Sequence, residues 1–124
     1  MQFVTFGSDD VANVFASLTP AELDEVSFGV IQVDGTGRII LYNRVEGEIA
    51  SYPPKAAIGR NFFTDVARCT HESGFHGRFV EGVRKGDLNV VFEWAIPATK
   101  ERMIQVHLKS ATEPDRYWIF VKRL

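Results

Sequence analysis

The chain has 124 residues, of which 45% are hydrophobic and 24% charged, with a net charge of −2 and one cysteine. A chain of this size fits a single domain, and its ten phenylalanines can fill a core without a metal or a disulfide. The sequence has no basic run and no long apolar stretch, which argues against nucleic-acid binding and against a membrane-spanning segment.

The N-terminal part reads as two short helices. Asp9 and Asp10 precede an apolar run over 11–16 with helical spacing, as residues that cap a helix do. Thr19 then starts a Thr-Pro-Ala-Glu segment, which has the pattern of a capping box with proline at the first helical position. We therefore expect a helical cap over residues 1–27, with few contacts to the sheet, ahead of a core over residues 28–124.

Two apolar runs, 30–33 and 39–42, flank a glycine-rich turn and predict a β-hairpin. The turn lacks the third glycine of a dinucleotide-binding motif and leads into a strand, so we do not expect it to bind phosphate. The segment from 43 to 72 has no sustained period and contains Pro53 and Pro54. It predicts short helices and loops that pack on the sheet and form one wall of a pocket.

The rest of the chain predicts one helix and three strands. Ser73 is expected to cap a helix that presents Phe75, Phe79 and Val83 on one face and ends at Gly86. Hydrophobic residues then alternate with a period of two in the segments 90–96, 104–109 and 118–121.

This order predicts an α+β domain whose central five-stranded antiparallel sheet is flanked by helices. One face of the sheet carries polar residues, including His107, and is either open to water or covered by other elements. The layout, with its N-terminal helical cap, resembles a PAS domain.

Short segments along the whole chain make the resemblance specific. They are Phe6-Gly7-Ser8, Phe28-Gly29, Tyr42-Asn43, Glu46-Gly47, Asn61-Phe62-Phe63, Cys69-Thr70 and Phe120-Val121-Lys122-Arg123. Together they fall where the photoactive yellow protein family has them, and the chain resembles that family of PAS-fold photoreceptors throughout.

The resemblance implies a blue-light photoreceptor that binds p-coumaric acid (4-hydroxycinnamic acid) as a thioester on Cys69. Members of the family respond to light by trans–cis isomerisation of the chromophore. Proton transfer from the residue matching Glu46 and partial unfolding then give a signalling state that reverts thermally. Such a protein is a sensor and not an enzyme.

The resemblance also assigns roles within the pocket. Taken alone, a single cysteine is most often a small buried hydrophobe, although Arg68 beside Cys69 could favour the thiolate. Glu46 is expected inside, protonated because burial and a nearby negative charge raise its pKa, and donating with Tyr42 to a phenolate oxygen. The other implied pocket residues are Ile31, Ala50, Tyr52, Phe62, Val66, Ala67, Thr70 and Ile96.

The sequence departs from the best-known family members at several positions. Ala50 replaces a threonine whose hydroxyl orients the tyrosine matching Tyr42, so part of the chromophore is expected to be protonated. Tyr52 replaces an arginine that covers the pocket. The loop over 97–102 is shorter and lacks a methionine that speeds dark recovery, which predicts slow recovery.

Other functions remain open on the residues alone. A PAS sensor for haem would need an axial histidine, yet His71, His76 and His107 are expected at the surface or with satisfied partners. A flavin sensor or a redox-sensing thiol at Cys69 are further alternatives. We expect a cytoplasmic monomer that signals to an unidentified downstream protein and binds neither nucleic acid nor membrane.

Overall fold

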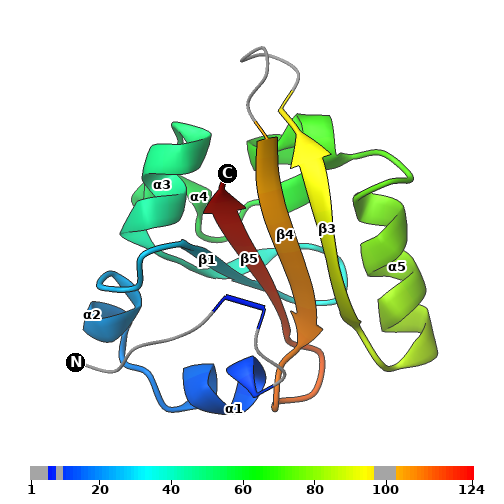
Figure 1. Ribbon diagram of the computed structural model, residues 1–124, viewed down its shortest axis with the longest axis horizontal. Coiled ribbons are helices and arrows are strands. Elements are labelled where there is room, and N and C mark those ends of the chain that lie inside the picture. The colour runs from blue at the N-terminus through cyan, green and yellow to red at the C-terminus, as the bar shows by residue number, and fades with distance from the viewer. Residues whose placement is uncertain (1–5, 8–9, 97–102) are drawn as a thin grey trace.

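One five-stranded antiparallel sheet organises the protein (Figure 1). The computed structural model describes residues 6–7, 10–96 and 103–124. Its strands follow the order β2-β1-β5-β4-β3 across the sheet. Their bounds are β1 Gly29–Val33, β2 Ile39–Tyr42, β3 Asn89–Ala95, β4 Met103–Ser110 and β5 Tyr117–Arg123. The predicted hairpin and the three C-terminal strands are confirmed, whereas Asp9 and the loop over 97–102 lie outside the described residues.

Short helices cover both faces of this sheet (Figure 1). The first face carries the two helices of the N-terminal cap, α1 Val11–Ala16 and α2 Pro20–Leu23. The second face carries α3 Arg44–Ala50, α4 Pro54–Ala57, the π-helix η1 Phe62–Val66, the 3-10 helix η2 Arg68–Thr70 and α5 His76–Lys85. The expected α+β architecture with flanking helices is therefore confirmed.

Strand alternation divides the hydrophobic residues into two cores. In β5, Ile119 and Val121 join the main core, while Trp118 and Phe120 face the cap. The ring of Phe15 from α1 lies 4.8 Å from that of Phe120 and 5.4 Å from that of Trp118. The cap helices make few close backbone contacts with the sheet, as expected, but β5 presents two large aromatic side chains that pack against them.

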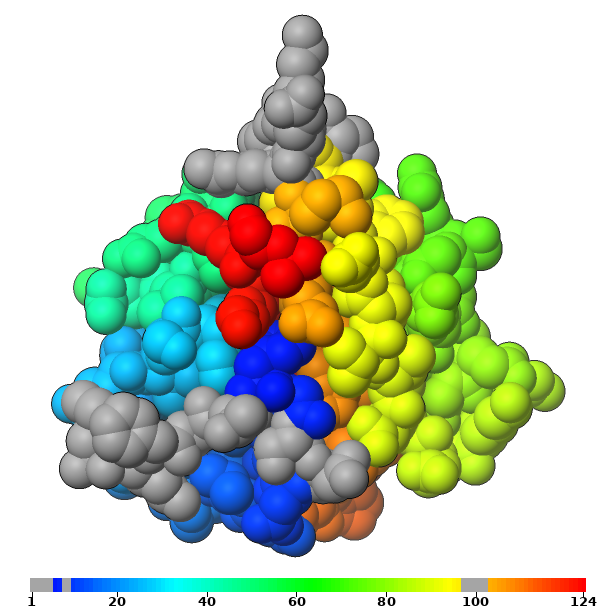
Figure 2. All heavy atoms as spheres, viewed as in Figure 1, coloured from blue at the N-terminus to red at the C-terminus, as the bar shows by residue number. Residues whose placement is uncertain are grey.

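His107 illustrates what the cap does to the sheet. The strand pattern placed it on a polar face, but only 1% of its surface is exposed. Its Nε2 lies 2.8 Å from Asn89 Oδ1, and its ring packs against those of Phe6 and Phe120. Figure 2 shows the blue N-terminal residues beside the orange β4, where they cover this part of the face.

A helix starts where the sequence predicts when its N-cap hydrogen bonds come from residues close in the chain. Thr19 accepts a hydrogen bond from the Glu22 amide, and the Glu22 carboxylate accepts one from the Thr19 amide, so the predicted capping box is confirmed. The prediction for Ser73 is wrong, since α5 begins three residues later at His76. Phe75 is the N-cap residue of α5, without a side-chain capping hydrogen bond, and its side chain is fully buried.

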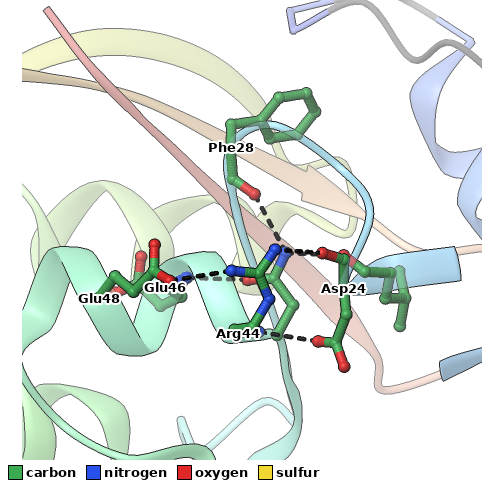
Figure 3. A network of polar contacts seen from close by, with 7 residues as sticks. Asp24, Phe28, Arg44, Glu46 and Glu48 are labelled. Carbon is green, nitrogen blue, oxygen red and sulfur yellow. Dashed lines mark hydrogen bonds and ion pairs between the residues drawn. The ribbon is translucent and has the colours of Figure 1, made fainter. Parts of the chain in front are cut away.

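Asn43 joins the cap, the sheet and the helical layer at the start of α3, where Figure 3 shows Phe28, Arg44 and Glu46 in one polar network. It is buried at the N-cap of α3, where its Oδ1 accepts hydrogen bonds from the amides of Glu46 (3.0 Å) and Val30 (2.9 Å). Its Nδ2 donates to the carbonyls of Leu23 (2.9 Å) and Phe28 (3.1 Å). One side chain thus fixes the start of α3 against both α2 and β1.

We predict that Asn43→Ala lowers the free energy of unfolding by about 2–4 kcal/mol, because it leaves several buried backbone groups without partners. Asn13→Ala is the matched control, since Asn13 is exposed and donates to Asp10. Urea unfolding followed by circular dichroism measures both variants. A loss below about 1 kcal/mol for Asn43→Ala would contradict this account of the junction.

Candidate functional site

A cavity of about 330 Å³ lies on the helical side of the sheet, where α3, η1 and η2 face β3, β4 and β5. Its walls bring together Glu46 and Cys69, which are 23 positions apart in the chain. The other wall residues are Ile49, Ala50, Ser51, Phe62, Val66, Ala67, Arg68, Thr70, Phe75, Trp94, Ile96, Ile104 and Val121. The lining is mainly apolar, so the few polar groups in it can decide what the cavity binds.

Glu46 places a carboxyl group in this apolar setting. Only 3% of the residue is exposed, and its Oε1 has no hydrogen-bond partner among the described residues. A side chain at Gly29 would collide with that oxygen, so glycine in β1 leaves the room that the carboxyl occupies. Burial raises the pKa of Glu46 to about 8, and the side chain is therefore neutral at pH 7.

Tyr42 ends β2 directly before Asn43, the N-cap of α3. Its hydroxyl is buried and has no partner among the described residues. Burial raises the pKa of this phenol, and the Glu46 carboxyl raises it further, so the two groups lie close enough to interact. Two buried polar groups without partners at one place are costly unless a ligand satisfies them.

Cys69 lies in η2, where its thiol is half-buried and lines the cavity. Burial raises the pKa of the thiol, and the nearby Glu72 carboxylate adds to this shift. The Trp94 indole lies near the thiol and offsets part of the shift, without reaching good hydrogen-bond geometry. The expectation that Arg68 favours the thiolate is not supported, because Arg68 is not among the groups that act on the pKa of Cys69.

Most of the pocket residues implied by the sequence lie in the cavity wall. They are Glu46, Ala50, Phe62, Val66, Ala67, Cys69, Thr70 and Ile96. Ile31, Tyr42 and Tyr52 instead pack in or against the main core and do not line the cavity.

Packing of the core explains why these three residues lie outside the cavity wall and why other wall residues were not predicted. Ile31 is fully enclosed between β2 and β5, and the chain turns at Ser51, with φ 54°, before Tyr52. Seven wall residues were not predicted from the sequence: Ile49, Ser51, Arg68 and Phe75, and the strand residues Trp94, Ile104 and Val121. The alternation of these strand residues marked them as facing a core, but not that this part of the core is hollow.

The three histidines lie away from the cavity wall. The His71 and His76 rings lie 4.8 Å apart beside Phe63. Within the ranges that the structure describes, no group of three or more His, Cys, Asp or Glu side chains could hold a metal ion. Over the same ranges, no helix has both the length and the apolar character needed to cross a membrane.

Comparison with known proteins agrees with this geometry. The PAS fold family matches residues 19–123. The chain is 46% identical to the photoactive yellow protein of Rhodothalassium salexigens over the full length of both, and 37% identical to that of Rhodobacter capsulatus over 99% of both. It also superposes on the photoactive yellow protein domain of the sensor histidine kinase Ppr from Rhodospirillum centenum, with TM-score 0.82 and 42% identity. That match covers 90% of this chain and 99% of the other.

The buried acid makes stability depend on pH. The unfolded chain loses the Glu46 proton near its ordinary pKa of 4.5, whereas the folded chain holds it to about pH 8. The free energy of unfolding should therefore fall as the pH rises between these values, by roughly 2–4 kcal/mol from pH 5 to pH 8. Urea unfolding of the apoprotein at several pH values measures this slope.

Glu46→Gln should remove this part of the pH dependence, because the amide does not titrate. Glu48→Gln changes an exposed carboxylate on the same helix and should keep the slope. An unchanged slope in Glu46→Gln would show that another group carries it.

Proposed function

Because the chain belongs to the photoactive yellow protein family of PAS domains, we propose that it is a blue-light photoreceptor with p-coumaric acid bound as a thioester to Cys69. One observation carries the proposal. The hydroxyl of Tyr42 and the Oε1 of Glu46 are buried, interact, and lack hydrogen-bond partners among the described residues. Glu46 lines the same cavity as the Cys69 thiol, as a covalently held phenolic acid would require, and Tyr42 acts on Glu46 from outside the cavity wall.

The cavity suits a small aromatic ligand. Its volume of about 330 Å³ lies at the lower end of the range for small-molecule pockets, roughly 300–1,000 Å³. Phe62, Val66 and Ile96 give it apolar walls on which a ring can pack. A chromophore bonded to Cys69 at one end and hydrogen-bonded to Glu46 and Tyr42 at the other would engage the thiol, the carboxyl and the phenol.

Each polar residue has a distinct task. Cys69 supplies the sulfur: it loses its proton, forms the bond to an activated acyl carbon, and the activating group leaves. Glu46, neutral at pH 7, and Tyr42 act as donors that keep a phenolate oxygen ionised in a dry site. When bound, the chromophore supplies absorption of blue light and trans–cis isomerisation.

Signalling follows from the proton on Glu46. The carboxyl can pass that proton to the phenolate oxygen, which becomes a neutral phenol, and a carboxylate is left in a low-dielectric site. Asn43 ties the Glu46 amide to the Leu23 carbonyl of the cap, so a shift of α3 disturbs that connection. We expect the cap to loosen, and the state to revert thermally as the proton returns.

Two positions at which this chain departs from the best-known family members, Ala50 and Tyr52, should alter the properties of this pocket. Ala50 lines the cavity without a hydroxyl, which fits the absence of a partner for the Tyr42 hydroxyl among the residues that the structure describes. A loosely oriented Tyr42 is a weaker donor, and part of the bound chromophore is then expected to be protonated and to absorb at shorter wavelength. Tyr52 packs against the core and adds no charge to the cavity.

The cellular location, the oligomeric state and the downstream partner complete the proposed function. We propose a cytoplasmic monomer that passes its state to a downstream signalling protein and catalyses no turnover. A redox-sensing thiol is disfavoured, because burial raises the pKa of Cys69 and such sensors need thiolate character.

We predict that purified apoprotein mixed with activated p-coumaric acid gives a yellow product that bleaches in blue light. The intact mass should increase by one acyl group, because the thiol is the only nucleophile of its type in the chain. Cys69→Ala should stay colourless and unmodified. A colourless protein with a free thiol, or equal labelling of Cys69→Ala, would overturn the proposed function.

In the reconstituted protein, Glu46→Gln should move the visible band to longer wavelength. An amide is a weaker donor than a carboxylic acid, so the ground-state phenolate is less stabilised. Absorption spectroscopy measures the shift, and Glu48→Gln, which lies in an exposed ion pair with Arg44, should leave the band in place. A band that does not move in Glu46→Gln would exclude the carboxyl as a donor to the chromophore.

A further inference from the structure

The C-terminal end of β5 brings a cation to the rim of the cavity. Val121 lines the cavity, and alternate residues of a strand share a face, so Arg123 lies on the cavity side of the sheet. Its cross-strand partner, Ile104, also lines the cavity. Figure 2 shows the red end of β5 at the surface beside the green α3.

Ile49 connects this cation to the helix that carries the buried acid. It lies three residues after Glu46, close to one helical turn, and lines the cavity. Two surface depressions next to the cavity are each lined by both Ile49 and Arg123. The Arg123 side chain therefore packs near the turn of α3 that places the carboxyl, and it forms no ion pair with any described residue.

Few other charges can act on Glu46. On its own helix, Arg44 and Glu48 form an exposed ion pair with each other at 2.9 Å. The titratable and charged groups on the neighbouring elements are Tyr42, Tyr52, Arg68, Cys69, Lys122 and Arg123. Of these, Arg123 is the one that opposes burial and lowers the pKa of Glu46.

We propose that Arg123 is the counter-charge of Glu46. Its positive charge stabilises the ionised carboxylate in the cavity and so tunes how readily the acid releases its proton. A cation at the rim favours the ionised carboxyl without filling the site, and it stays in place whether or not the cavity is occupied. The use of this tuning in signalling rests on the proposed function. The electrostatic coupling is a property of the apoprotein.

The test is a pH titration of Glu46 in the apoprotein by ¹³C NMR of its side-chain carboxyl carbon, with the signal assigned by its loss in Glu46→Gln. Arg123→Gln should raise the midpoint by about half a pKa unit or more. Arg123→Lys keeps the charge and should restore most of the original midpoint. Lys122→Gln removes the neighbouring cation, which lines only one of the two depressions and does not act on the pKa of Glu46, and it should leave the midpoint unchanged.

Ionic strength gives an independent check on the unaltered protein. Because Arg123 is at the surface, raising salt from about 0.05 M to about 1 M should raise the Glu46 midpoint there and have little effect in Arg123→Gln. An unchanged midpoint in Arg123→Gln, or an equal shift in Lys122→Gln, would overturn the inference. Because no chromophore is present, failure of reconstitution would leave this result intact.

Discussion

The junction at Asn43 is the constraint on which the arrangement of the protein depends. Its four hydrogen bonds close the start of α3 against the last turn of α2 and the beginning of β1. The same contacts place Glu46 in the first turn of α3, directed at the space left by Gly29. Burying an acid destabilises the fold, and the hydrogen bonds of Asn43 to the surrounding backbone hold the acid in its position.

The sheet separates two environments that this junction connects. The main core surrounds the cavity on one face, and the aromatic cluster of the cap covers the other. A change in charge at Glu46 acts on the first environment, whereas the cap belongs to the second. Asn43 bonds both to the carbonyl of Leu23 in the cap and to the amide of Glu46 beside the cavity. A single side chain therefore connects the two environments. Sensing and response can thus occupy opposite faces of a small domain.

The cavity itself is a place where stability is given up for function. Tyr42 and Glu46 each bury a polar atom without a partner from the described residues, a cost that a folded protein normally avoids. The core residues around them, including Phe62 and Phe75, are fully buried. A phenolate ligand would satisfy both groups at once, and Arg123 limits the cost when the acid is ionised.

Local patterns in the sequence determined the elements whose causes are local. The capping box at Thr19, the hairpin over β1 and β2 and the alternation of the last three strands depend on near neighbours. The family motifs singled out Glu46 and Cys69, which line the same cavity. Only the tertiary structure decided that α5 starts at His76, that the cap buries His107, and that Tyr52 and Ile31 stay out of the cavity wall. These outcomes depend on which distant side chains meet across the sheet, and the free energy of that packing is not encoded in the spacing of any one segment.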